Sequence, residues 1–293
     1  MSAFNGMAHL DDQVESILDQ QTPGPLRLLI RDDGSSDGSL PWLTGLDDER
    51  VEVIAGENLG VKASFLWLLE EARRRPWQYL ALADQDDVWL PGKLDRAIDR
   101  LGSPDNPALY CSALQLVDAS LSPLGQHRHR GRIDFQEGFL DNAVTGCSCV
   151  VTRGLFEQLH ALPRAQAIHM HDWWLYLVAL SFGHVVYDPE SRILHRQHGH
   201  NVNGMPRGLA RVVTVLSRRY GSERRVSRAR QAGEFLRLHE PRLPEGRRRY
   251  LEKLSCSGES LAGRLDFAIR RWPASMKGAA GVASRLAFAV GIT

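Results

Sequence analysis

The sequence lacks several features that mark whole classes of protein. No run of 18 or more apolar residues occurs among its 293 residues, so no transmembrane helix is predicted. Residues 1–6 are neither basic nor continuously apolar, and we therefore expect no signal peptide. Only four cysteines occur, none in a Cys-x-x-Cys pair, which predicts reduced thiols and a cytoplasmic location. The closely spaced Cys147 and Cys149 do not suit a zinc knuckle, and we predict that they lie in a buried strand.

The composition is that of an ordinary globular protein, with 43% apolar and 24% charged residues. Its length suits one large domain, or one domain with an appendage. The net charge of +1 conceals a division: residues 1–204 contain 17 Lys and Arg against 28 Asp and Glu, whereas residues 205–293 contain 19 against 7. An acidic body and a basic tail predict that the body binds cations and that the tail meets an anion.

Short apolar segments alternate with amphipathic segments along the first two thirds of the chain. Strands are predicted over 26–31, 51–54, 79–83, 109–117 and 184–187, and helices over 10–20, 61–74, 94–101 and 173–182. This alternation is typical of an α/β fold with a mainly parallel sheet flanked by helices, in which ligands bind at the carboxyl ends of the strands. No strand is predicted after residue 204. We therefore expect a first domain over 1–204 and a helical C-terminal region over 205–293.

Two acidic clusters directly follow predicted strands. Asp32 and Asp33 begin a polar turn after the strand at 26–31, where carboxylates suit hydrogen bonds to a base or a sugar, although a plain turn is the simpler explanation of this cluster alone. Asp84, Asp86 and Asp87 follow the strand at 79–83. Three carboxylates within four residues repel one another unless a cation neutralises them, and Mg²⁺ or Mn²⁺ takes such oxygen ligands. A solvated acidic turn is the alternative, and we keep both interpretations.

A third polar group lies near the end of the first domain. Asp172 is predicted at the N-cap or in the first turn of a helix, which is a structural role. Its carboxylate can also accept a proton, and the adjacent Trp173 and Trp174 offer an apolar wall to a sugar ring. Arg196 and His198 supply a guanidinium and an imidazole that suit a phosphate or a metal ion.

Together these motifs occur in one order along the chain. The matching stretches are 2–6, 30–38, 58–65, 82–94, 145–147, 171–175 and 196–204. In these stretches the sequence resembles the family 2 glycosyltransferases of the GT-A fold, and it is most similar to their bacterial rhamnosyltransferase-type members. The resemblance extends over roughly the first 205 residues.

The resemblance implies an inverting, metal-dependent enzyme that moves a sugar, with rhamnose as the first candidate, from a nucleotide-diphosphate donor to a polysaccharide or lipid-linked acceptor. Asp172 would be the general base. The implied ligands of Mg²⁺ or Mn²⁺ are Asp86 and His198. The implied contacts of the donor nucleotide are Phe4, Asp32, Asp33, Asn58, Lys62 and Asp84. The implied diphosphate contacts are Arg196 and His198, and the implied sugar or acceptor contacts are Gly146, Trp173 and Trp174.

One departure from the family pattern concerns the start of the chain. Family members usually have an apolar strand of about five residues ahead of the turn at 4–6, whereas here only three residues precede Phe4. Either that strand lies upstream of Met1, or the sheet is incomplete and nucleotide binding is weakened. The second case gives the alternative function, a degenerate sugar-nucleotide binding module.

The same resemblance implies that the basic tail meets a membrane surface, because transferases of this kind often act on lipid-linked acceptors. Apolar residues mix with arginine at 283–290, and each basic residue near an anionic leaflet contributes about 1 kcal/mol. We therefore predict salt-sensitive, peripheral binding to the inner face of a membrane. Nucleic acid is not expected, since the tail lacks interleaved aromatic residues. A solvated helical surface is the alternative.

Overall fold

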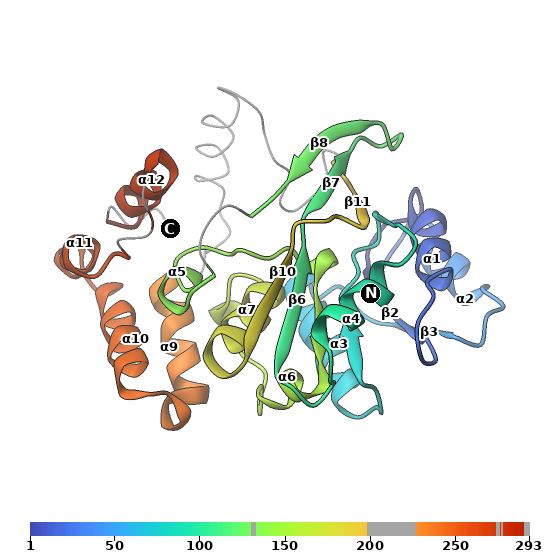
Figure 1. Cartoon of the computed structure of the whole chain (residues 1–293). Coiled ribbons are helices and arrows are strands. Elements are labelled where there is room, and N and C mark those ends of the chain that lie inside the picture. Colours follow the sequence, from blue (N-terminus) through green and yellow to red (C-terminus); the bar gives the residue numbers. More distant parts are fainter. Residues whose placement is uncertain (130–132, 198–226, 274–275, 277, 290–293) are drawn as a thin grey trace. The chain divides into compact units, whose positions relative to one another are not determined.

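The computed structural model describes residues 1–129, 133–197, 227–273, 276 and 278–289 (Figure 1). The chain divides into two compact units. The first comprises residues 1–130, 142–162 and 170–196, and the second comprises residues 131–141, 163–169 and 197–293. The boundary predicted near residue 205 lies outside the described residues. The second unit also includes two short segments from the first two thirds of the sequence.

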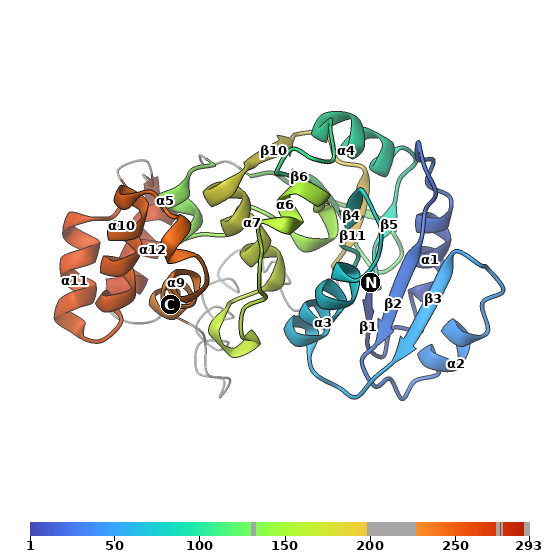
Figure 2. The same cartoon turned by 90° about the horizontal axis from the view of Figure 1, so that it is seen from below.

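The first sheet of the first unit is entirely parallel and has the order β1-β2-β3 (Figure 2). Its strands are β1 (Ser2–Ala3), β2 (Leu28–Asp32) and β3 (Val51–Ala55). The helices that alternate with them are α1 (Leu10–Leu18), α2 (Ser39–Thr44) and α3 (Val61–Arg73). Ala3 pairs with Asp32 at the carboxyl ends of β1 and β2. The loops that follow these two strands therefore meet at one edge of the sheet, where ligands of such sheets bind.

Two further sheets of the first unit are mixed. In the order β10-β6-β9-β4, β6 (Ala108–Ser112) is parallel to β10 (His184–Asp188), whereas β9 (Val150–Thr152) is antiparallel to β6 and to β4 (Tyr79–Ala81). The order of the other sheet is β5 (Val88–Trp89), β11 (Ile193–Arg196), β7 (Leu114–Val117) and β8 (Pro123–His127). The accompanying helices are α4 (Lys93–Leu101), α6 (Arg153–Glu157) and α7 (His171–Phe182). The alternation of strands and helices is confirmed, but the pairing is more mixed than predicted.

Two local predictions need correction. The strand predicted over 109–117 is two strands, β6 and β7, because Ala113 between them donates its N–H to Asp188 O (2.9 Å) and the chain passes from one sheet to another. Cys147 does not lie in a strand but in the short 3₁₀ helix η1 (Gly146–Ser148), and Cys149 follows it before β9 begins. The predicted burial of both cysteines is confirmed, since neither is exposed.

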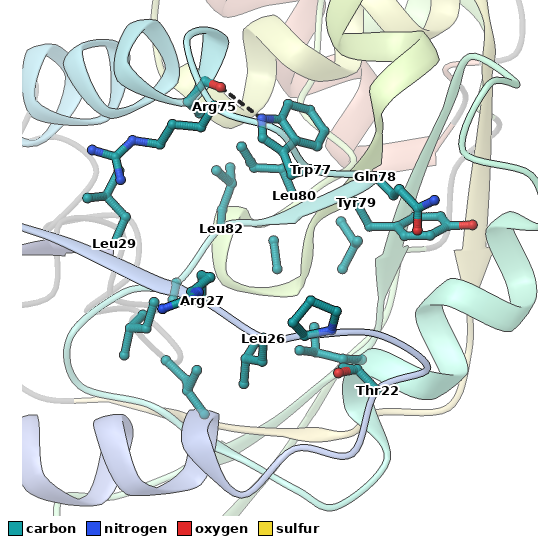
Figure 3. Close-up of a pocket in the computed structure, with 18 of the residues that line it drawn as sticks. Thr22, Leu26, Arg27, Leu29, Arg75, Trp77, Gln78, Tyr79, Leu80 and Leu82 are labelled. Atoms are coloured by element: carbon teal, nitrogen blue, oxygen red, sulfur yellow. Dashed lines mark hydrogen bonds between the residues drawn. The ribbon is translucent and has the colours of Figure 1, made fainter. Parts of the chain in front are cut away.

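A cavity of about 1130 Å³ lies between β2 and β4 (Figure 3). Leu26 and Leu29 line it beside β2, and Leu80 and Leu82 line it beside β4. The amino group of Met1 donates to Leu29 O at 2.7 Å, and β1 pairs with β2 over two residues only. β1 and β4 are both edge strands of their sheets, and the cavity lies beside them.

The described part of the second unit is helical, as predicted for the C-terminal region. Its α-helices are α5 (Phe135–Gly138), α9 (Arg228–His239), α10 (Glu245–Ser257), α11 (Leu261–Arg270) and α12 (Gly278–Ala289), with short 3₁₀ helices η2 (Ala165–Ala167) and η3 (Glu240–Arg242). The buried Glu234 of α9 pairs with Arg164 (2.6 Å) and with Arg237 (2.7 Å), which fixes the segment 163–169 to this unit. Among the described helices, none is long and apolar enough to cross a membrane.

Candidate active site

The loops after β1 and β2 are joined by side-chain hydrogen bonds. The Asn5 N–H donates to Ser35 Oγ (2.9 Å), and Asn5 Oδ1 accepts from the Ser36 N–H (2.8 Å). Asn5 has φ of +48°, a left-handed conformation that asparagine adopts more readily than most residues. The turn that presents Phe4 is therefore held in place by the polar loop that follows Asp32 and Asp33.

Asp32 and Asp33 are both buried, but they have different partners. Asp32 Oδ2 accepts from the backbone N–H groups of Gly34 (3.2 Å) and Ser35 (2.9 Å), while its Oδ1 is buried with no hydrogen-bond partner among the described residues. Asp33 pairs with Arg31 and accepts from the N–H groups of Leu59 (2.9 Å) and Gly60 (2.8 Å). Asp33 thus holds the loop at 58–60, which contains the exposed Asn58 and leads into α3 and Lys62.

Gln85 joins the loop after β1 to the acidic turn after β4. Its Oε1 accepts from the Phe4 N–H (2.6 Å) and its Nε2 donates to Phe4 O (3.1 Å). A Cβ at Gly6 would lie 2.6 Å from Gln85 Cδ, so a side chain at this position would displace the Gln85 amide from Phe4. The Phe4 side chain itself is 45% exposed. Gln85 is not among the site residues predicted from the sequence. Only its position between Asp84 and Asp86 indicated that it belongs to the site.

The acidic turn brings together three carboxylates. Burial raises the pKa of Asp84 well above its ordinary value, and the neighbouring carboxylates of Asp87 and Asp86 raise it further. Gln13 of α1 donates to Asp84 O (2.8 Å) and fixes the backbone of the turn. Without a cation, this arrangement therefore disfavours the charged form of Asp84.

Asp87 connects the acidic turn to β11. Its Oδ1 lies 2.8 Å from His195 Nδ1 and accepts from the Arg196 N–H (3.3 Å), while its Oδ2 is buried with no hydrogen-bond partner among the described residues. Burial opposes the charge of His195, but the hydrogen bond to Asp87 and the charges of Asp87, Asp84 and Asp86 together outweigh it and raise the histidine pKa. Ligand atoms of Asp87, His195 and Cys147 lie within 4.8 Å of one another. The pairing of β5 with β11 produces this cluster, and neither strand was predicted from the sequence.

Arg196, a predicted diphosphate contact, has protein partners. Its side chain is buried, pairs with Asp12 of α1 and donates to Ala119 O (2.6 Å). It stands at the end of β11, directly after His195. The diphosphate role of Arg196 remains a prediction, and His198 lies outside the described residues.

Asp172 lies in the first turn of α7 rather than at its N-cap, which is Met170. Its Oδ1 accepts from the Trp173 N–H (2.7 Å), and Asn142 Nδ2 donates to its Oδ2 (3.5 Å). Burial raises the pKa of Asp172 to about 6, against the lowering effect of these hydrogen bonds. A carboxyl group with this pKa is largely ionised at neutral pH and can still accept a proton.

Gly146 lies against Asp172, and the two tryptophans that follow Asp172 in the sequence differ in their exposure. A Cβ at Gly146 would lie 3.5 Å from Asp172 Cβ, so the η1 turn lies directly against the carboxylate. Trp173 is 8% exposed, whereas Trp174 is fully buried because α7 is apolar around almost its whole circumference. The Trp174 indole therefore packs in the core, and its sugar contact remains a prediction.

The structure brings most of the predicted site residues to one part of the first unit. Phe4, Asp32 and Asn58 lie on loops that hydrogen bonds connect, and Gln85 links Phe4 to the acidic turn. The charge of Asp172 also contributes to the raised pKa of Asp84, which places the two carboxylates within electrostatic reach. The arrangement therefore combines a carboxylate-rich turn with a further buried carboxylate, that of Asp172.

Comparisons with known proteins identify the family of the chain. The family model described as "Glycosyl transferase family 2" matches residues 1–159. The dTDP-rhamnosyl transferase RfbG of Shigella flexneri is 26% identical over 218 residues, which cover 70% of this chain and 73% of that protein.

Solved structures show the same fold at low sequence identity. S. aureus TarS (residues 1–349) superimposes with a TM-score of 0.55 and 11% identity, covering 99% of this chain and 79% of that chain. The mannosyltransferase PcManGT from Pyrobaculum calidifontis, solved with GDP-Man and Mn²⁺, gives a TM-score of 0.51 and 14% identity, covering 99% and 78%. The GT-A fold is thus confirmed, and the chain is a glycosyltransferase that belongs to glycosyl transferase family 2.

Proposed function

We propose that this enzyme inverts the anomeric carbon as it moves a sugar from a nucleotide-diphosphate donor to a hydroxyl of a glycan or lipid-linked acceptor. The proposal rests on Asp172, a buried carboxylate with a pKa of about 6. Its charge also raises the pKa of Asp84 in the acidic turn. Direct displacement by an acceptor hydroxyl requires one base and inverts the configuration. The name of RfbG makes dTDP-rhamnose the first donor to test.

Asp172 would accept the proton of the acceptor hydroxyl. The Trp173 N–H holds Oδ1 at 2.7 Å and so fixes the orientation of the carboxylate. We assign Oδ2, on the side of Asn142 and Gly146, to the acceptor. Trp173, which keeps a small exposed area, is the better candidate than Trp174 for the apolar wall of that site.

The donor nucleotide would lie over the loops after β1, β2 and β3. The exposed Phe4 ring suits stacking on a base. Of the two adjacent carboxylates, Asp32 has an Oδ1 that meets no hydrogen-bond partner in the described part of the chain, whereas Asp33 accepts from the loop at 58–60. We therefore assign the base contact to Asp32. Asn58, Lys62 and Asp84 complete the proposed nucleotide contacts.

The acidic turn fits a hard divalent cation. Its side chains supply oxygen ligands, and the crowding that raises the pKa of Asp84 is relieved by a positive charge. We assign Asp86 and His198 as ligands, while Asp87 and His195 pair with each other and position the turn. When bound, Mg²⁺ or Mn²⁺ would neutralise the diphosphate as it leaves the sugar.

The positioning role of Asp87 leads to a prediction. Asp87→Asn removes the charge that orients His195, and changes behind a metal ligand typically cost about 10–100-fold in metal affinity or activity. The Mn²⁺ concentration at half-maximal donor binding should therefore rise by about that factor, as measured by titration calorimetry. Asp99→Asn, the same change on the exposed side of α4, is the control. An unchanged Mn²⁺ requirement in Asp87→Asn would leave Asp87 with a purely structural role.

A screen of nucleotide sugars by thermal shift, with and without Mn²⁺, tests the proposed function. A ligand that binds the folded state raises the apparent Tm by mass action, so the acceptor need not be known. We expect one nucleotide sugar to raise the Tm only when Mn²⁺ is present. No stabilisation by any nucleotide sugar would contradict the proposal.

The alternative is a sugar-nucleotide binding module without full activity. Donor turnover distinguishes the two functions: the module would bind the donor with Mn²⁺ and release no nucleoside diphosphate.

A further inference from the structure

Exposed apolar side chains are concentrated on two helices of the second unit. Seven large apolar side chains are exposed in the described residues, and five of them lie on α11 and α12. These five, which we call the hairpin face, are Leu261 (55% exposed), Leu265 (41%), Ile269 (69%), Val282 (54%) and Leu286 (62%). Figure 2 shows the two helices among the successive helices of this unit.

The spacing of the five residues gives each helix an outward apolar stripe. Leu261, Leu265 and Ile269 are four residues apart, as are Val282 and Leu286, and residues at this spacing share one face of a helix. The opposite side of α11 packs inward, because Phe267 is buried and its ring lies 5.5 Å from that of Phe288 on α12. The hairpin face is therefore additional to the apolar surface that holds the two helices together.

Basic residues accompany the hairpin face. Residues 260–289 contain five Lys and Arg residues and one acidic residue, Asp266. Arg285 donates to Ile269 O at 3.2 Å, so a guanidinium lies beside the most exposed residue of the stripe. Arg270 and Arg271 are exposed at the end of α11, and Arg270 pairs with Asp266 (2.9 Å). An apolar face with arginine around it is the pattern of a helix that lies in a membrane interface.

We infer that the hairpin of α11 and α12 is a docking surface for an anionic lipid bilayer, into which the five apolar side chains insert. The charge of the face selects this partner over a second copy of the chain, because a two-fold dimer through this face would bring together two surfaces with the same excess of positive charge. A bilayer with anionic headgroups supplies the opposite charge and the apolar depth together. This inference does not depend on the transfer reaction.

Co-sedimentation of the full chain with vesicles tests the inference. Binding to phosphatidylcholine vesicles that contain phosphatidylglycerol is expected, with much weaker binding to phosphatidylcholine alone. The double variant Leu265→Ser with Ile269→Ser should weaken binding about tenfold or more, since it removes two inserted side chains. The variant's Tm, and its thermal shift with nucleotide sugar and Mn²⁺, should stay those of the parent, which separates loss of docking from loss of folding or donor binding.

A charge-matched pair of variants separates the hairpin face from the general charge of the tail. Arg271→Gln with Arg285→Gln should reduce binding several-fold, whereas Arg248→Gln with Arg249→Gln, on the exposed part of α10, should change it little. Equal effects of the two pairs, or unchanged binding by the serine variant, would overturn the inference. A concentration-dependent dimer in gel filtration that the serine variant abolishes, with no vesicle binding, would assign the face to a second copy and would also overturn it.

Discussion

Asp172→Asn is expected to lower the rate of sugar transfer by about 10²–10⁴-fold, the usual cost of losing a general base, while donor binding survives. Asparagine keeps the oxygen that accepts from the Trp173 N–H, so the first turn of α7 retains that hydrogen bond. It removes the oxygen that would accept the acceptor's proton. Steady-state kinetics with the full chain should therefore show a loss in kcat and little change in donor affinity.

The fold should tolerate this substitution. Losing a negative charge in the first turn of an exposed helix typically lowers the free energy of unfolding by about 0.3–1 kcal/mol. Burial already destabilises the ionised form of Asp172, as its raised pKa of about 6 shows, and removing that charge acts in the opposite direction. The Tm of the variant at neutral pH should therefore remain close to that of the parent. Unfolding of the variant would instead support a structural role for Asp172 at the start of α7.

The pH dependence of the parent enzyme follows from the same carboxylate. Asp172 must be ionised to act as a base, and its pKa is about 6. Transfer should therefore fall as the pH drops below about 6, approaching a tenfold loss for each pH unit, and Asp172→Asn should lack this limb. Turnover of the variant within a few-fold of the parent, with the acid limb still present, would assign the base to another residue.

Asp86→Ala is expected to abolish the Mn²⁺ dependence of donor binding and to lower transfer by about 10³-fold, because a bound cation supplies several kcal/mol of charge stabilisation. The physical reason is the crowded turn, in which the neighbouring carboxylates Asp86 and Asp87 both raise the pKa of Asp84. Removing Asp86 relieves this repulsion, so the variant without metal should be at least as stable as the parent. Titration calorimetry of the donor with and without Mn²⁺ measures the loss.

Asp99→Ala on α4 provides the control for Asp86→Ala, since it removes one exposed carboxylate far along the chain from the turn. It should leave the Mn²⁺ dependence unchanged. If Asp86→Ala binds the donor with the parental Mn²⁺ dependence, the cation is held by other residues. The cluster of Asp87, Cys147 and His195 would then be the first to examine, because its three ligand atoms lie within 4.8 Å of one another.

Local sequence patterns predicted the elements that bear the site. The apolar strand over 28–32 ends in Asp32, and the strand over 79–81 leads to Asp84. The position of these carboxylates at strand ends could therefore be predicted from the alternation of apolar and amphipathic segments and from the composition of the turns. Helix α3 and helix α7 were likewise evident from helical spacing. These features depend on residues close together in the chain, which is the information that a single sequence contains.

The roles that depend on distant pairs were not predictable in this way. Gln85 acts on Phe4 across 81 positions, and Asp87 meets His195 across 108 positions. Strands β5 and β11 are two and four residues long and form through distant pairings, β5 with β11 and β11 also with β7, so neither shows a periodic pattern. Trp174 beside Asp172 suggested a sugar contact, but the tertiary burial of α7 points it into the core.

Whether the chain is a metal-dependent transferase with Asp172 as its base can be measured directly. The measurement is the release of nucleoside diphosphate from the selected nucleotide sugar, for the parent and for Asp172→Asn, with Mn²⁺ and with a chelator. We expect release by the parent with Mn²⁺ and no release with the chelator. In Asp172→Asn the rate of release should fall about 10²–10⁴-fold although the donor still binds. Donor that binds to the parent with Mn²⁺ and is never turned over, in the presence of a glycan or lipid-linked acceptor pool, would contradict the account and favour a binding module.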